Sequence, residues 1–453
     1  MTSSTVIYDF IATLSLFNFM RIFVMLLGSD MYDIKQIKRQ HHNQRLSPYR
    51  PLVSIVIPAF NEETGVIRTL ESVLASRYNN YEVIIIDDGS TDRTAQIVRS
   101  YIKALPKFEL ESYAASWNRW SNLKRRYFHA EVNKHRVVFV SQENGGKGSA
   151  LNNGIRNYAR GKLIMVVDAD SLLHTTALGK MVQHFRDRRV IASASNVKII
   201  PSRSGLGIAQ RIEYLISYRM KRSLTYFGME YIIGGVGSTF RRSALIKTDL
   251  YDTDTMTEDI DLTLKLIQHY GNTRYKIHYA ADAITYTEHV LRVRSLIKQR
   301  FRWKYGRFQS LLKNKALFFA KKGGKYSTQL TWYQLPYALF GELVLFIEPI
   351  LVTYILYITV RYLDLSSLFS VYCIVTTFVF LMILGEESEA WHSKVLMSFI
   401  LPAVYFMMYV LTFVEFAALI KSIKQSKKLF DGKTYEGSWE HVERSGEPVT
   451  VTP

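Results

Sequence analysis

Two pairs of acids in this chain have the residue types and spacing that metal binding and proton transfer require. Asp168 and Asp170 follow the apolar run "KLIMVV", and Glu258 and Asp259 open the helical pattern "EDIDLTLKLI". Mg²⁺ and Mn²⁺ prefer carboxylate oxygens and often share them with substrate phosphates. We therefore expect Asp168 and Asp170 to hold Mg²⁺ or Mn²⁺. Asp259 is placed to act as a general base whose proton affinity Glu258 raises, although acids also cap helices at this position.

A second acidic stretch and a glycine-rich stretch could bind a nucleotide. Asp87 and Asp88 end the run "YEVIII" and could accept hydrogen bonds from a uracil ring or a ribose, although an ordinary strand-to-helix loop explains them equally well. In "NGGKG" the glycines allow close backbone approach and Lys147 adds a cation ahead of a helix, which favours anion binding. The lysine spacing excludes a P-loop. Gly235 in "GGVGS" would similarly let the backbone pass close to a ligand.

The stretch "QRFRW" combines cations with an indole. Arg300 and Arg302 can offer forked donors to a leaving diphosphate, and Trp303 offers a flat apolar face to a sugar ring. An interfacial belt of Trp and Arg at lipid headgroup depth is the alternative for this stretch alone.

The elements that position these groups alternate between strand and helix from residue 51 to 306. β-Branched runs such as "LVSIVIPAF" and "YEVIIIDDG" end in turn residues and predict buried parallel strands, with a helix between them. We predict an α/β wound sheet whose ligands bind at the carboxyl ends of the strands. Segment 107–135 interrupts the pattern with tryptophans and basic residues, and we interpret it as an insertion with helical character.

Composition favours a membrane protein over a nucleic-acid binder. Lys and Arg number 58 against 39 acids, giving a net charge of +19, yet 48% of the residues are hydrophobic. The basic clusters flank apolar runs, and no nucleic-acid reading motif is present. The lone Cys373 excludes an intrachain disulfide and a cysteine-based metal site.

The apolar runs predict a multi-pass protein of the cell membrane whose catalytic domain is cytoplasmic. The positive-inside rule does not settle which side holds the basic tail. The predicted parts are an N-terminal transmembrane helix (1–30), a basic linker (31–50), the α/β domain (51–306), an amphipathic interface helix (307–330), transmembrane helices (331–420) and a polar tail (421–453).

Taken in order, "IPAFNEE", "DDGS", "NGGKG", "DAD", "GGVGS", "TEDID" and "QRFRW" resemble the motif series of membrane-bound processive family 2 glycosyltransferases. That family includes cellulose, chitin, hyaluronan and poly-N-acetylglucosamine synthases, and the last group is the most similar in chain length and tail. The resemblance covers residues 52–303. It implies a mixed sheet of the GT-A type and inverting transfer from a UDP-sugar to a growing polysaccharide that is exported. It also implies the lipid bilayer and a small membrane accessory subunit as partners.

The resemblance also implies a role for each matching residue. The catalytic acids are Asp259 as base and Glu258 beside it. Donor binding is implied for Pro58, Asn61, Glu62, Asp87, Asp88, Lys147, Asp168, Arg300 and Arg302, acceptor binding for Gly235, Gln299 and Trp303, and metal binding for Asp168 and Asp170.

Other functions remain open at this point. A cellulose- or hyaluronan-type product is one, and transfer of a single sugar to a lipid acceptor is another. A transporter or membrane scaffold with a degenerate nucleotide-binding head is a third. Product size, and the effect of Asp259→Asn on sugar transfer, distinguish them.

Overall fold

A computed structural model of the chain describes residues 3–45, 47–105, 109–113, 125–132, 134–202, 204–362, 365–386 and 389–430. Residues 431–453 of the predicted tail and parts of the predicted insertion lie outside the described residues.

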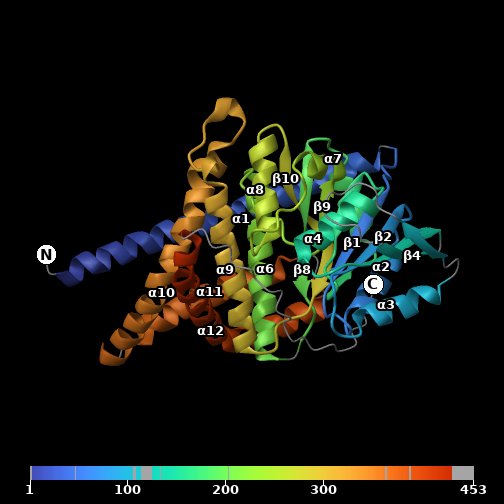
Figure 1. Cartoon of the computed structure of the whole chain (residues 1–453). Coiled ribbons are helices and arrows are strands. Elements are labelled where there is room, and N and C mark those ends of the chain that lie inside the picture. Colours follow the sequence, from blue (N-terminus) through green and yellow to red (C-terminus); the bar gives the residue numbers. More distant parts are fainter. Residues whose placement is uncertain are drawn as a thin grey trace.

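A ten-stranded mixed sheet forms the centre of the α/β domain, in the order β3-β4-β5-β2-β1-β6-β9-β8-β10-β7 (Figure 1). The strands that pair in parallel near its middle are β1 (Val53–Ala59), β2 (Tyr81–Asp87), β5 (His135–Ser141) and β6 (Leu163–Val166). The remaining strands beyond β6 are β7 (Ser171–Leu173), β8 (Val190–Ile199), β9 (Ser238–Arg241) and β10 (Lys276–Thr287). β9 runs antiparallel between β6 and β8. The mixed α/β sheet predicted from the sequence is confirmed.

Helices cover both faces of this sheet because alternate side chains of the central strands point to opposite faces. Every residue of β1 and β2 is buried. One face packs against α2 (Val66–Leu74), α3 (Thr94–Lys103) and α5 (Ala177–His184). The other face packs against α4 (Lys147–Asn153), α7 (Arg242–Lys247) and α8 (Glu258–Tyr270). Burial on both faces explains why these strands are continuous apolar runs.

Where the structure describes the predicted insertion, it forms strands and not the helix that we predicted. β3 (Glu109–Tyr113) and β4 (Arg125–Val132) pair antiparallel, and β4 pairs with β5. The alternation of aromatic and polar residues in "RRYFHAEV" has the period of a strand. The segment therefore widens the sheet at one edge.

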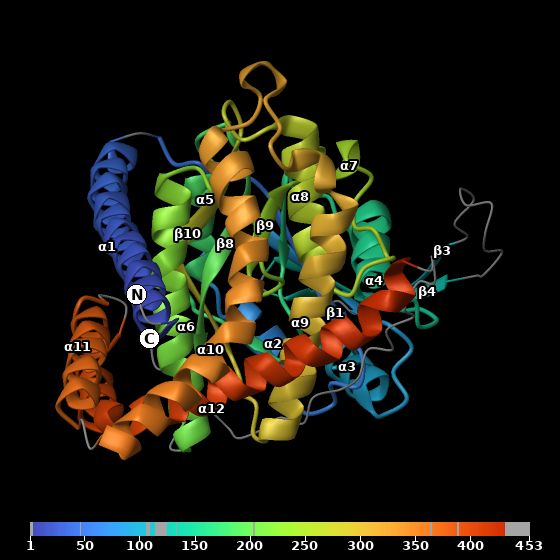
Figure 2. The ribbon, with the colours of Figure 1, turned by 90° about the vertical axis from the view of Figure 1, so that its left-hand side faces the viewer.

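Long helices pack beside the α/β domain (Figures 1 and 2). They are α1 (Ser3–Gln44), α6 (Gly205–Tyr226), α9 (Val293–Lys313), α10 (Leu335–Tyr362), α11 (Leu365–Leu384) and α12 (Trp391–Phe430). α1 packs on α6, while α12 crosses α9 and α6. α1 continues through the boundary predicted at residue 30, so most of the predicted linker is helical.

The predicted amphipathic helix over 307–330 is also wrong. α9 runs through Trp303 and ends at Lys313, and the chain then makes short helical turns at Lys315–Leu317, Lys322–Gly324 and Gln329–Gln334. Gly323 and Gly324 have positive φ angles, which interrupt a regular helix.

The structure contradicts the predicted transmembrane region and, with it, the predicted multi-pass membrane location. Among the residues that the structure describes, no helix is both long enough and apolar enough to cross a bilayer. The side chains of Glu342 on α10 and Glu415 on α12 form ion pairs with α9.

Candidate active site

The register of the parallel strands brings the predicted polar residues to one edge of the sheet. Ala59 at the end of β1 lies opposite Asp87 at the end of β2, and Val56 lies opposite Val166 at the end of β6. Asn61, Asp88 and Asp168 follow those ends directly. The site therefore forms where the carboxyl ends of β1, β2 and β6 meet.

Asp88 has one carboxylate oxygen that accepts no hydrogen bond from the part of the chain that the structure describes. Its Oδ1 accepts hydrogen bonds from Gln142 Nε2 at 2.7 Å and from the Gly145 N–H at 3.0 Å. Its Oδ2 is buried and accepts no hydrogen bond from any described residue. Burial raises the pKa of Asp88, although the donors to Oδ1 oppose this shift. The free oxygen can accept a hydrogen bond from a ligand that enters here.

The other residues predicted on this side shape the loops around Asp88. Asn61 has a φ of 56°, and its Oδ1 accepts the Thr91 N–H at 2.8 Å. Glu62 donates its N–H to Thr94 Oγ1 at 2.8 Å. Asp87 Oδ1 accepts the Ser90 N–H at 3.2 Å, and Pro58 is a buried position of β1. These hydrogen bonds hold the loop after β1 against the loop after β2, at the edge of the site.

Lys147 joins two of the predicted acids into one cluster. Its Nζ lies 2.8 Å from Asp168 Oδ1 and 3.4 Å from Glu258 Oε1. Burial alone would lower the pKa of Lys147, but the charges of Asp168 and Glu258 outweigh burial and hold this pKa above its usual value. A Cβ at Gly235 would lie 2.6 Å from Lys147 Nζ, so a side chain at this position would displace the ammonium.

The loop that carries Asp168 and Asp170 is fixed against α2. Thr69 Oγ1 donates to the Ala169 carbonyl at 2.8 Å, and a Cβ at Gly65 would lie 2.9 Å from the same oxygen. Ser171 Oγ donates to Asp170 Oδ1 at 2.8 Å. The two acids thus project from a rigid turn, as a metal site requires.

Asp259 lies in the first turn of α8 and has a strongly altered proton affinity. Burial raises the pKa of Asp259 to about 7, and the charge of Glu258 adds to this effect, while Lys147 opposes it. The Ile260 N–H donates to Asp259 Oδ1 at 2.8 Å. A carboxylate with a pKa near 7 is well matched to accepting a proton at neutral pH. Burial, the larger cause, is not evident from the sequence.

α9 packs directly on the loop that precedes Asp259, which brings the "QRFRW" stretch to the same site. A Cβ at Gly306 would lie 2.6 Å from Thr257 Oγ1, so only glycine allows this approach. Gln309 Oε1 accepts the Met256 N–H at 3.1 Å. Trp303 lies three residues before Gly306 and therefore on the same face of the helix, one turn earlier.

The two arginines of this stretch differ in their surroundings. Arg300 Nη2 lies 2.8 Å from Glu213 Oε2 and its Nε lies 3.3 Å from Glu415 Oε1. Its guanidinium also lies 4.7 Å from the centre of the Trp303 ring. Arg302 is half-buried and forms no ion pair within the described part of the chain. Arg300 therefore contacts the Trp303 ring and joins α9 to α6 and α12. The guanidinium donors of Arg302 remain available to a ligand. Gln299 is buried beside them.

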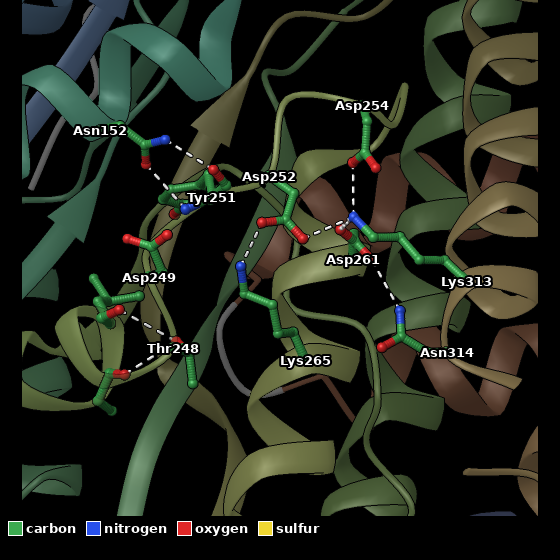
Figure 3. A network of polar contacts seen from close by, with 12 residues as sticks. Asn152, Thr248, Asp249, Tyr251, Asp252, Asp254, Asp261, Lys265, Lys313 and Asn314 are labelled. Atoms are coloured by element: carbon green, nitrogen blue, oxygen red, sulfur yellow. Dashed lines mark hydrogen bonds and ion pairs between the residues drawn. The ribbon is translucent and has the colours of Figure 1, made fainter. Parts of the chain in front are cut away.

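An acidic cluster outside the predicted site was not found from the sequence (Figure 3). Asp252, Asp254 and Asp261 offer oxygens close enough together to hold a metal ion. Lys313 Nζ lies 2.7 Å from Asp252, 2.7 Å from Asp254 and 2.9 Å from Asp261, where that ion would sit. This cluster therefore already has its cation, and it fastens the end of α9 to α8.

Comparison with known proteins identifies the class to which this site belongs. Residues 54–119 match the model described as glycosyl transferase family 2, and residues 125–306 match the model described as glycosyltransferase like family 2. The α/β domain thus carries family 2 glycosyltransferase domains, and the prediction of a family 2 glycosyltransferase is confirmed.

Individual relatives are similar over the same region. The chain is 32% identical over 265 residues to the poly-beta-1,6-N-acetyl-D-glucosamine synthase of Staphylococcus aureus strain COL, covering 58% of this chain and 56% of that protein. It is 33% identical to the Staphylococcus epidermidis protein of the same name, with the same coverage. The match thus spans little more than half the length of these relatives.

A solved structure shares the fold. The mannosyltransferase PcManGT from Pyrobaculum calidifontis, determined in complex with GDP-Man and Mn²⁺, superimposes with a TM-score of 0.53 at 17% identity. The superposition covers 90% of this chain and 99% of that one.

Proposed function

We propose that this chain is an inverting glycosyltransferase that transfers N-acetylglucosamine from UDP-N-acetylglucosamine to the end of a growing β-linked polymer, processively. The observation that carries the proposal is the cluster of Lys147, Asp168, Glu258 and Asp259 beside the "QRFRW" helix. The similarity to poly-beta-1,6-N-acetyl-D-glucosamine synthases supports the choice of sugar.

The chain's own residues suit each part of this reaction. Asp88 Oδ2 is free to accept a hydrogen bond from the uracil ring. Arg302 has donors available for the leaving diphosphate, and charge-assisted bonds of this kind are strong. Trp303 offers its ring to the terminal sugar of the acceptor.

A single inversion requires a base in line with the acceptor hydroxyl and the anomeric carbon. The acceptor oxygen bonds to that carbon while its proton passes to Asp259. The bond from the carbon to the diphosphate oxygen breaks, and its electron pair leaves with the diphosphate. No covalent intermediate with the enzyme is needed.

Asp168 and Asp170 fit a divalent cation because both present carboxylate oxygens from a fixed turn. Such an ion, when bound, supplies positive charge to the diphosphate. Lys147 Nζ lies 2.8 Å from Asp168 Oδ1, so a bound ion would share this carboxylate with Lys147. Either Mg²⁺ or Mn²⁺ suits the oxygen donors.

A donor screen with product analysis tests this function. The purified chain is incubated with labelled UDP-N-acetylglucosamine, UDP-glucose and UDP-glucuronic acid, with Mg²⁺ or Mn²⁺. We expect incorporation from UDP-N-acetylglucosamine into a polymer that a poly-β-1,6-N-acetylglucosamine hydrolase degrades. Transfer of a single sugar would refute processive synthesis, and incorporation of glucose alone would refute the proposed donor.

A further inference from the structure

Glu230 is a buried acid with one unpaired oxygen, and the reaction described above gives it no role. The residue is 2% exposed. Its Oε1 accepts the Ile232 N–H at 3.0 Å, and Lys221 Nζ lies 3.4 Å from the same oxygen. Its Oε2 is buried and has no hydrogen-bond donor among the described residues.

A buried carboxylate oxygen without a donor is costly, because water is lost and nothing replaces it. Glu82 shows how the same chain satisfies an equally buried glutamate away from the site. Its Oε1 accepts from Ser54 Oγ and from the Arg160 N–H, both at 2.6 Å, and its Oε2 accepts from Arg136 at 2.9 Å. Glu230 Oε2 therefore has an accepting position that no described residue occupies.

The surroundings of Glu230 connect it to the proposed base. Lys221 Nζ lies 5.8 Å from the centre of the Tyr218 ring on α6. Burial raises the pKa of Tyr218 well above its usual value, and the charges of Glu230 and Asp259 both add to the shift. Tyr218 is therefore within electrostatic reach of both acids, and its hydroxyl forms no hydrogen bond with a described residue.

The segment that follows Glu230 leads into the catalytic cluster. The Ile233 N–H donates to Thr263 Oγ1 at 3.2 Å, and that hydroxyl donates to the Asp259 carbonyl at 2.7 Å. Gly235, two residues further on, lies against Lys147. The segment is thus fixed to the helix of the base, so Glu230 has a defined position relative to Asp259.

We propose that Glu230, Tyr218 and Lys221 form an acceptor subsite, in which Glu230 Oε2 accepts a hydrogen bond from a hydroxyl of the sugar chain that enters beside Asp259. This proposal rests on the proposed function for the identity of the acceptor. A carbohydrate fits the subsite because its hydroxyls can donate to Glu230 Oε2 and hydrogen-bond to the Tyr218 hydroxyl, while its C–H faces pack on aromatic rings. A hydroxyl bound here fixes the orientation of the acceptor, and orientation contributes strongly to transfer rates.

Direct binding of an oligosaccharide tests the subsite without depending on sugar transfer. The probe is a β-1,6-linked N-acetylglucosamine trisaccharide, titrated against the full chain by calorimetry, with UDP titrated separately. In Glu230→Gln the amide oxygen is retained by the Ile232 N–H and Lys221, so the amide NH₂ replaces Oε2 and cannot accept. We expect trisaccharide affinity to fall about tenfold or more, with UDP affinity unchanged.

A second subsite variant and a matched control accompany Glu230→Gln in the titration. Tyr218→Phe removes a hydroxyl that no described residue uses, and we expect it to weaken the trisaccharide several-fold even if Glu230→Gln folds poorly. Glu82→Gln is the matched control, because it removes an equally buried charge, and trisaccharide affinity should match the wild type.

Wild-type affinity in both Glu230→Gln and Tyr218→Phe, or no trisaccharide binding by the wild type, would overturn the subsite. A failure of the proposed function looks different: UDP would not bind and no UDP-sugar would be used, whatever the trisaccharide result.

Discussion

Two substitutions beside Asp259 should move the pH profile of the reaction in opposite directions. With the pKa of Asp259 at about 7, the unprotonated base makes up about 10% of the enzyme at pH 6 and about 90% at pH 8. kcat/KM of the wild type should therefore rise about tenfold between pH 6 and pH 8. Glu258→Gln removes the charge that raises this pKa, so the acid limb should move to lower pH. Lys147→Met removes the charge that lowers it, so the limb should move to higher pH.

Initial rates of UDP release between pH 5.5 and 9 provide the assay, with each variant normalised to its own maximum. Normalisation separates the position of the limb from any loss of donor binding in Lys147→Met. Each unit of displacement corresponds to about 1.4 kcal/mol between the two protonation states. Asp259 is not the group that sets the pH profile if both variants keep the wild-type profile, or if both profiles move in the same direction.

Three other perturbations test the remaining parts of the site and fold. Trp303→Ala should shorten or abolish the polymer while UDP affinity stays at the wild-type value, and the exposed Trp391→Ala should change neither; full-length product from Trp303→Ala would contradict the acceptor role. Lys313→Met should lower the free energy of unfolding in urea by about 2–3 kcal/mol because Asp261, which is 1% exposed, loses its cation, whereas the exposed Lys315→Met should be neutral. Burial holds the pKa of His278 well below 6.5, so the unfolded chain binds the extra proton as the pH falls below 6.5 and stability should decrease there. Burial alone would raise the pKa of Asp282, but the neighbouring His184 lowers this pKa to about 2. The ionised Asp282 therefore stabilises the fold above about pH 4, and this stabilisation is lost as the pH falls toward 2. A midpoint of thermal unfolding that is flat from pH 7 to pH 5 would contradict the assignment for His278.

The strands and the acids at their ends could be predicted because both depend on local sequence. A buried parallel strand must be a continuous apolar run, and the turn that ends it must be polar. Asp88 and Asp168 follow such runs, so their meeting at one edge of the sheet follows from the geometry of parallel strands. The need for glycine at positions 235 and 306 could not be predicted from the sequence. It arises from close contacts with Lys147 and Thr257, which form only in the folded chain.

The ion pairs that determine how each charged residue acts could not be predicted. Arg300 matched a diphosphate-binding motif, yet Glu213 on α6 and Glu415 on α12 neutralise it in the folded structure. Glu230 carried no motif at all, because its significance lies in one oxygen that receives no hydrogen bond from the residues that the structure describes. Long-range contacts of this kind depend on tertiary packing, which a local pattern does not encode.

The apolar helices were over-interpreted for a related reason. The run in α10 was interpreted as membrane-spanning on length and hydropathy, but Glu342 within it pairs with Lys304 and Arg307 of α9. An apolar pattern alone does not distinguish packing against another helix from exposure to lipid.

A comparison of Asp259→Asn with the wild type tests whether Asp259 is the base, with sugar transfer from UDP-N-acetylglucosamine and UDP affinity measured on the same preparations. If the cluster around Lys147 is the transfer centre and Asp259 its base, transfer should fall by a factor of about 10²–10⁴ while UDP affinity changes less than about threefold. Transfer at the wild-type rate in this variant would contradict the account.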